Sequence, residues 1–253
     1  GMAQKQGHIV QPWVDQTPAV ELATISLKVE VESRVDCRAP QLALENVDES
    51  QVLLDGVPVE MNATGFFTDK AVGTMALPDI AAGTHTIEIT LSFTKKTSIE
   101  WFYLLGDFGV TLQGLHGVLT EPVRRLSFGD WTAQGLPFYG GNVTYHCVAP
   151  VDGSSIQMPQ FKATTITVAS QGESAAIFHP PYMADVAVKA GAPLDITLFG
   201  HRANCFGPVH LAESGMDWLG PNSYRMKGSL FSPEYQLQPL GIVSAPIVFE
   251  REV

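Results

Sequence analysis

The sequence predicts an all-β protein made of two antiparallel β-sandwich domains. Short stretches alternate between apolar and polar residues, as half-buried strands do. The chain also has 23 glycines and 17 prolines, which favours short strands joined by turns. Long helical runs rich in Ala, Leu, Glu and Lys are scarce, so helix should be minor. A length of 253 residues is enough for two medium-sized domains, each with an apolar core.

The first predicted domain covers residues 14–127. Residues 23–31 alternate cleanly, and the apolar positions from Ile25 to Val31 fall on one face, which indicates a half-buried strand. Residues 41–45 are a short second strand. Residues 52–59 carry an Asp-Gly pair between apolar residues, and this pair readily adopts the positive φ of a tight hairpin turn.

A longer alternating strand begins at Gly83 and places His85 on its apolar face. No second histidine or carboxylate lies at the spacing of a metal site. We therefore expect a histidine that is satisfied in the core or at a sheet edge, in preference to a ligand.

Residues 100–110, EWFYLLGDFGV, form a nearly continuous apolar run. Such a run is typical of a strand buried on both faces or of a contact between domains. Residues 115–127 then lose the alternation. We place the domain boundary there, so that the second domain covers residues 128–253.

The second domain opens with WTAQGLPFYGGNVTY, residues 131–145. Trp131, Phe138 and Tyr139 are its bulkiest apolar residues. Aromatic rings beside turns either close the end of a sandwich core or form a platform for a sugar ring, and the core interpretation is favoured. Further strands are expected at residues 164–168, 175–178, 184–188 and 194–199, and the stretch from 230 to 249 is expected to close the last sheet.

A loop rich in hydrogen-bonding groups follows, with the sequence FGHRANCFGPVH at residues 199–210. It carries Arg202, Asn204 and His210 at the end of a predicted strand, where polar groups suit the hydroxyls of a sugar. The alternative is that Arg202 and Asn204 bind the loop's own carbonyl groups, and both interpretations stand. Trp218 is the best single candidate for stacking on a sugar.

Charge and cysteine content narrow the classes of partner. The net charge is -11 and the basic residues form no long cluster, so nucleic acid is not an expected partner. The three cysteines, Cys37, Cys147 and Cys205, lack CxxC spacing and are expected to be buried free thiols. The N-terminal residues contain no apolar run long enough for a signal peptide or a membrane span. A membrane partner is therefore not expected, and a cytoplasmic location is the default.

A resemblance to a known family rests on five segments that occur in this order: EWFYLLGDFGV, GLPFYGGNVTY, DITLFG, RANCFGPVH and SPEYQLQPLGI. Over roughly residues 20–253, the chain resembles the C-terminal galactose-binding-like jelly-roll domains of large bacterial glycoside hydrolases, of the β-galactosidase-like and rhamnosidase-like kind. The resemblance implies galactose-binding-like jelly-roll sandwiches. It implies no activity, because such enzymes take their catalytic carboxylates from a barrel, and this chain lacks the alternating strand and helix pattern of one.

The resulting expectation is a non-catalytic carbohydrate-binding protein. Its candidate ligand-binding residues are Trp131, Tyr139, Arg202, Asn204, His210 and Trp218. No catalytic residue and no cofactor is predicted, and the metal content is open, although galactose-binding-like sandwiches often hold a structural calcium ion.

Two alternatives belong to other classes. One is a structural accessory domain or subunit of a glycosidase, which would associate with the catalytic domain or with itself through an apolar surface around residues 101–108. The other is an enzyme with carboxylates from Asp107, Asp130, Glu213 and Asp217, which would have to lie about 5 to 10 Å apart in pairs.

Overall fold

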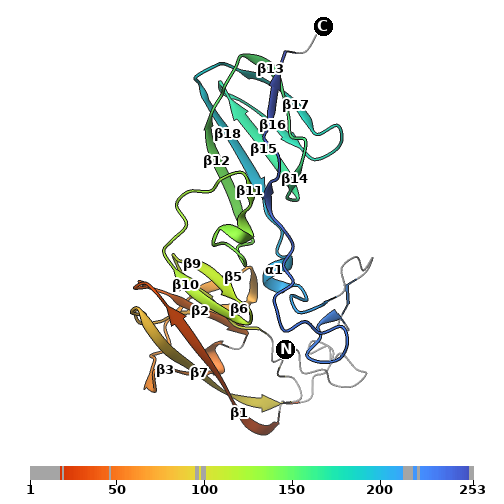
Figure 1. Cartoon of the computed structure of the whole chain (residues 1–253). Coiled ribbons are helices and arrows are strands. Elements are labelled where there is room, and N and C mark those ends of the chain that lie inside the picture. The colour runs from red at the N-terminus through yellow and green to blue at the C-terminus, as the bar shows by residue number, and fades with distance from the viewer. Residues whose placement is uncertain are drawn as a thin grey trace. The chain divides into compact units, whose positions relative to one another are not determined.

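The computed structural model describes residues 18, 20–45, 47–94, 97, 101–212, 219–220 and 223–250 (Figure 1). Strands make up 49% of the structure and helix 6%, which confirms the predicted all-β class. Among the described residues, no helix is both long and apolar enough to cross a bilayer.

The chain separates into two compact units. The first comprises Gly1–Pro122 and Gly220–Ser229, and the second comprises Val123–Leu219 and Leu230–Val253. The boundary therefore lies slightly before residue 127, because Leu126 already packs against the second core and the Ser127 N–H donates to Gln134 Oε1 at 2.9 Å. The stretch at 115–127 still contains a strand of the first unit, residues 116–120, and the second unit begins at Val123.

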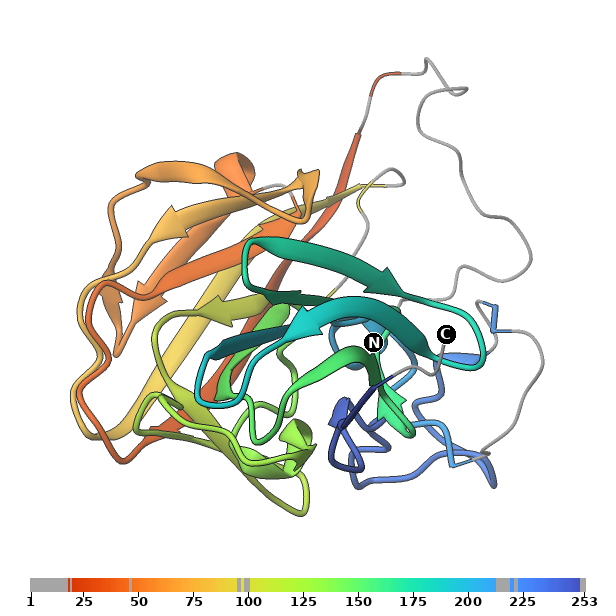
Figure 2. The same ribbon diagram turned by 90° about the horizontal axis from the view of Figure 1, so that it is seen from above.

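The first unit contains a six-stranded sheet in the order β4-β3-β7-β1-β10-β9. All neighbours are antiparallel except β1 and β10, which pair in parallel. The strands are β1 (Glu21–Ser33), β3 (Gln51–Leu54), β4 (Val57–Pro58), β7 (Gly83–Thr94), β9 (Gly109–Gln113) and β10 (His116–Thr120). They are coloured red to yellow-green in Figure 1 and, seen from above, in Figure 2.

A four-stranded sheet in the order β5-β6-β2-β8 completes this unit. Its strands are β2 (Gln41–Glu45), β5 (Ala63–Phe67), β6 (Asp69–Ala76) and β8 (Tyr103–Leu105), and a one-turn 3-10 helix, η1 (Val47–Glu49), follows β2. One core unites the two sheets: Ile87 and Ile89 of β7 are buried with Leu42 of β2 and Met75 of β6. The unit is therefore a β-sandwich.

Two local predictions for this unit are confirmed. Ile25, Leu27 and Val31 of β1 contribute to the core, as the alternation predicted, whereas Val29 on the same face is exposed. Asp55 and Gly56 join β3 to β4 with φ angles of 52° and 77°, as a tight hairpin requires.

The apolar run at residues 100–110 differs from its prediction. It forms two short strands, β8 and the start of β9, instead of one. Phe102, Leu104 and Phe108 pack against the core, and the large apolar residues from 101 to 108 are only partly exposed. The run therefore belongs in part to the core of this unit, and its role as a docking surface stays a prediction.

The second unit contains a four-stranded sheet in the order β12-β18-β15-β16 and two three-stranded sheets, β17-β13-β20 and β11-β19-β14. The strands are β11 (Gly129–Asp130), β12 (Asn142–Val148), β13 (Gly153–Gln157), β14 (Phe161–Lys162), β15 (Thr165–Ser170), β16 (Glu173–Ile177), β17 (Met183–Val188), β18 (Pro193–Phe199), β19 (Gly241–Ile242) and β20 (Ile247–Phe249). Ile166 and Ile196 of the four-stranded sheet share a core with Ile156 and Val186 of the β13 sheet.

Trp131 lies inside this second core with 0% of its surface exposed. It begins a 3-10 helix, η2 (Trp131–Gln134), whose first turn is capped by Asp130: the Thr132 N–H donates to Asp130 Oδ1 at 2.9 Å. The backbone N–H of Trp131 donates to the Leu240 carbonyl at 2.7 Å. The core interpretation of Trp131 is therefore correct. Its candidacy as a ligand-binding residue is wrong, because a fully buried ring has no face to offer a sugar.

The C-terminal stretch is mostly not strand, contrary to the prediction. Only β19 and β20 pair with other strands, and residues 233–240 are without regular structure. These irregular residues form one wall of a cavity.

Candidate functional site

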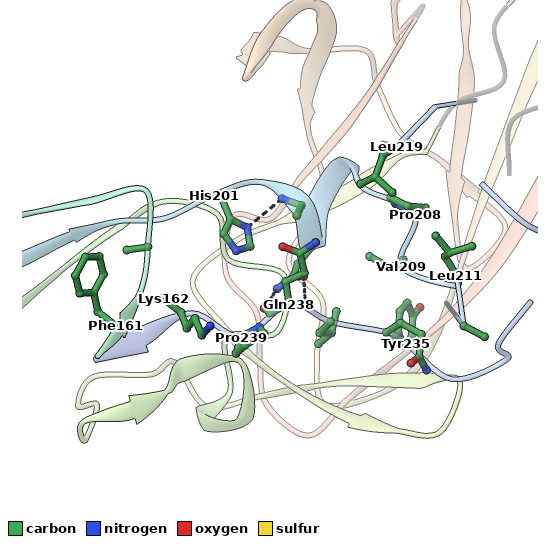
Figure 3. Close-up of a pocket in the computed structure, with 16 residues that line it drawn as sticks. Phe161, Lys162, His201, Pro208, Val209, Leu211, Leu219, Tyr235, Gln238 and Pro239 are labelled. Atoms are coloured by element: carbon green, nitrogen blue, oxygen red, sulfur yellow. Dashed lines mark hydrogen bonds between the residues drawn. The ribbon is translucent and has the colours of Figure 1, made fainter. Parts of the chain in front are cut away.

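The second unit contains a cavity of about 860 Å³ (Figure 3). This volume is in the range of about 300 to 1,000 Å³ that is typical of small-molecule sites. The walls come from β14, from the residues around helix α1 (Ala203–Phe206), from residues 208–209 and 211–212, from Leu219 and from residues 235–239. The cavity therefore lies where the loop after β18 meets the irregular C-terminal stretch.

The loop after β18 can take this course only because residue 200 is glycine. A Cβ atom built on Gly200 would lie 2.5 Å from the carbonyl oxygen of Gly141. The loop then forms the single turn of α1, in which the Arg202 carbonyl accepts hydrogen bonds from the N–H groups of Cys205 at 3.0 Å and Phe206 at 2.9 Å. The close backbone approach thus positions His201 and Asn204 at the cavity.

Hydrogen bonds from the side chain of Asn204 connect two walls of the cavity. The side chain is 3% exposed. Its Nδ2 donates to the Gln238 carbonyl at 2.9 Å, and its Oδ1 accepts the Gln238 N–H at 2.8 Å (Figure 3). The side chain of Asn204 binds backbone groups, as in the second interpretation, but they belong to Gln238 in the C-terminal stretch and not to its own loop. Asn204 lines the cavity, but its main hydrogen-bonding capacity is already used, so it positions the wall.

His201 presents a neutral imidazole to the cavity. Its Nδ1 accepts the N–H of Ala203 at 3.3 Å, so the proton of the neutral ring is on Nε2. Burial lowers the pKa of His201 below its usual value, which keeps the ring neutral at physiological pH. Nε2 is therefore a hydrogen-bond donor.

Tyr235 supplies an aromatic wall that is held between two other rings. Its ring centroid lies 5.1 Å from that of Phe138 and 4.8 Å from that of His210. Burial raises the pKa of Tyr235, so its hydroxyl is protonated at neutral pH. His210, a predicted ligand-binding residue, lies behind this wall: its Nδ1 is 3.1 Å from the Ser232 carbonyl, and it is not among the lining residues.

The remaining predicted ligand-binding residues do not line the cavity. Tyr139 is 43% exposed, and its hydroxyl donates to the Asn142 carbonyl at 3.1 Å. Arg202 is exposed, and its backbone passes close to Gly140. Trp218 lies outside the described residues. Asn204 is thus the one predicted residue, among those the structure describes, that reaches the cavity.

Sequence reasoning missed Lys162, Gln238 and the role of Tyr235. These residues lie far along the chain from the loop at 199–210, and β14 meets the C-terminal stretch through its pairing with β19, Phe161 with Ile242 and Lys162 with Gly241. Tyr235 and Gln238 in the segment SPEYQLQPLGI are the signal in the sequence for this wall of the cavity.

The carboxylates named for an enzyme do not form a site in the described part of the chain. Asp130 caps η2 and also accepts the Leu240 N–H at 3.1 Å. Asp107 belongs to the other unit. Glu213 and Asp217 lie outside the described residues.

The described residues contain no metal-ligand cluster and no disulfide. No three His, Cys, Asp or Glu side chains gather there as a metal site would need. The three cysteines are free, as expected, but only Cys37 is fully buried. The Cys205 thiol donates to the Phe138 carbonyl at 2.6 Å, and burial raises its pKa.

A scan against models of protein families finds no match for this chain, and a search of curated proteins finds none either. The chemistry of the cavity is therefore the basis for a functional assignment.

Proposed function

We propose that this protein is a non-catalytic carbohydrate-binding protein whose second unit holds a sugar in the cavity between α1 and residues 235–239. The observation that carries the proposal is this cavity of about 860 Å³, which combines an aromatic wall with hydrogen-bonding side chains. The proposal also takes both units as galactose-binding-like sandwiches related to accessory domains of bacterial glycoside hydrolases, as the sequence resemblance suggests.

The lining suits the two surfaces of a pyranose. A sugar ring has an apolar face made of C–H groups, and the lining residues Tyr235 and Leu237 supply apolar surface. It also carries hydroxyls, which both donate and accept hydrogen bonds. His201 Nε2 and the ammonium of Lys162 donate, and the Gln238 amide does both.

The cavity walls are held in place before any ligand binds. The two hydrogen bonds between Asn204 and Gln238 fix one wall, and the rings of Phe138 and His210 fix Tyr235. Such preorganisation lowers the entropic cost of binding. Each hydrogen bond to a sugar still contributes only about 1 kcal/mol net, because water is displaced from both partners. We therefore expect dissociation constants on the order of 0.1 to 1 mM.

The test is binding of the whole chain to a broad glycan panel, followed by isothermal titration with each hit, with and without calcium. Heat released by a defined sugar supports the proposal. No heat from a folded protein across the panel would overturn it and would favour the structural accessory role in a glycosidase.

A variant that fills the cavity with a large side chain tests whether the sugar binds there. Ala212 is an exposed lining residue, so Ala212→Trp should block binding and leave the fold intact. The matched control is Ala176→Trp, because Ala176 is exposed on the edge strand β16 and does not line the cavity. Equal binding by the two variants would place the sugar elsewhere.

A further inference from the structure

The cavity differs in charge from the rest of the chain. The chain has 26 acidic and 15 basic side chains. Among the described residues that line the cavity, none is Asp or Glu, and Lys162 is the one side chain with a full charge, since His201 is neutral. The part of the wall that the structure describes thus carries a positive charge and no negative one, which favours a negatively charged ligand group.

We propose that the sugar bound in this cavity carries an anionic group, a carboxylate or a sulfate ester, which pairs with Lys162; this rests on the carbohydrate binding proposed above. Lys162 is exposed at the end of β14. Within the described part of the chain, no carboxylate lies within ion-pair distance of its ammonium. The cation is therefore available to a ligand.

His201 supplies a second donor for the same group. Because its Nδ1 accepts the Ala203 N–H, its Nε2–H is directed to partners other than the backbone of α1. Lys162 and His201 line the same cavity (Figure 3). A carboxylate or sulfate has several acceptor oxygens and can accept from both donors, and hydrogen bonds to an ionised group are about twice as strong as those between neutral groups.

The net charge of -11 works against an anionic ligand at long range. That repulsion is screened beyond about 8 Å at physiological ionic strength. The pairing with Lys162 acts at contact, at a separation well inside this screening length. The contact interaction therefore decides the preference, and the repulsion mainly slows association.

The experiment compares three ligands by isothermal titration of the whole chain: trigalacturonic acid, a sulfated carrageenan tetrasaccharide and neutral galactotriose. We expect at least one anionic sugar to bind about tenfold or more tightly than the neutral one, and this preference should shrink in 0.5 M NaCl because Lys162 is exposed. Tighter binding of the uronate assigns a carboxylate, and tighter binding of the carrageenan fragment assigns a sulfate.

Lys162→Met keeps the length of the side chain and removes its charge. It should abolish the anionic preference and weaken binding of the neutral sugar by about fivefold at most, since one hydrogen bond of about 1 kcal/mol to a hydroxyl is lost. The control is Lys189→Met, since Lys189 is exposed in the same unit but does not line the cavity; it should retain the preference.

Two results would overturn the inference alone. The first is that neutral glycans bind as tightly as anionic ones, and the second is that the anionic preference survives in Lys162→Met. Either result contradicts the role of Lys162 and leaves the proposed carbohydrate binding intact. Absence of binding by all three sugars and by the glycan panel would overturn the proposed function as well.

Discussion

His85 closes the Asp55-Gly56 hairpin of the first unit through a short ion pair. Its Nδ1 lies 2.7 Å from Asp55 Oδ2, and its Nε2 lies 2.9 Å from the carbonyl oxygen of Ala81. Both partners are acceptors, so both ring nitrogens can donate only when the imidazole is protonated. The sequence predicted a satisfied histidine at this position, and the structure identifies its partners.

This pair makes the stability of the first unit depend on pH. The hydrogen bond to Asp55 raises the pKa of His85, so the histidine's contribution is full below its unfolded pKa of about 6.5 and is lost as pH rises through the raised value. The hydrogen bond to His85, and then that from the Thr86 N–H, lowers the pKa of Asp55. The contribution of Asp55 is present above about pH 3.9 and is lost as pH falls through the lowered value.

We therefore expect the pair to stabilise the first unit most between about pH 4 and 6.5. The effect should be below about 1 kcal/mol, since the Asp55 side chain is 46% exposed and screened by solvent. An NMR titration of His85 measures its pKa, and denaturant unfolding at pH 6 and 8 measures the effect on stability. His85→Gln should remove this pH dependence, whereas His146→Gln should keep it, because His146 is an exposed residue of the other unit. A His85 pKa at or below about 6.5 would contradict the assignment.

Trp131→Ala should destabilise the second unit by about 3 to 5 kcal/mol, the usual cost of deleting a fully buried large aromatic side chain. Trp131→Phe should cost less, since in the described part of the chain the indole Nε1 has no hydrogen-bond partner to lose. Denaturant unfolding followed by near-UV circular dichroism measures both. A Trp131→Ala variant of unchanged stability that no longer bound sugar would restore the ligand-binding interpretation.

Asn204→Ala should loosen the cavity wall. The substitution removes both hydrogen bonds to Gln238 and leaves its backbone groups unpaired, at a cost of about 1 to 3 kcal/mol. Hydrogen exchange at the Gln238 amide should become about 10 to 100 times faster, which corresponds to the same range of free energy. Gln236→Ala is the control, because the Gln236 side chain bonds to Ser232 and Glu234 instead. Unchanged exchange at Gln238 would show that Asn204 does not hold this wall.

Gly200→Ala should displace the loop that carries His201. The added methyl group would lie 2.5 Å from the Gly141 carbonyl oxygen, and relief of such overpacking costs about 1 to 3 kcal/mol. The variant should melt at a lower temperature and bind sugar more weakly. Gly117→Ala in β10 should be tolerated, since the nearest atom to its added Cβ is 3.5 Å away. Equal melting temperatures for the two variants would contradict the close approach.

Local sequence determined the strands and the hairpin. Alternation in residues 194–199 reports which face of the strand is buried, and the Asp-Gly pair sets its own turn, since both depend on neighbours within a few residues. These features place the chain in the all-β class without knowledge of any distant contact.

Tertiary structure decided the strand order, the division into units and the cavity. The parallel pairing of β1 with β10 and the meeting of β14 with β19 join segments that lie far apart in sequence. The roles of polar and aromatic side chains are decided in the same way. The side chain of Asn204 is hydrogen-bonded to the backbone of Gln238. Trp131 is buried in the second core, and Lys162 lines a cavity whose other walls come from distant segments. Burial and hydrogen-bond satisfaction are properties of the folded surroundings, so no local pattern records them.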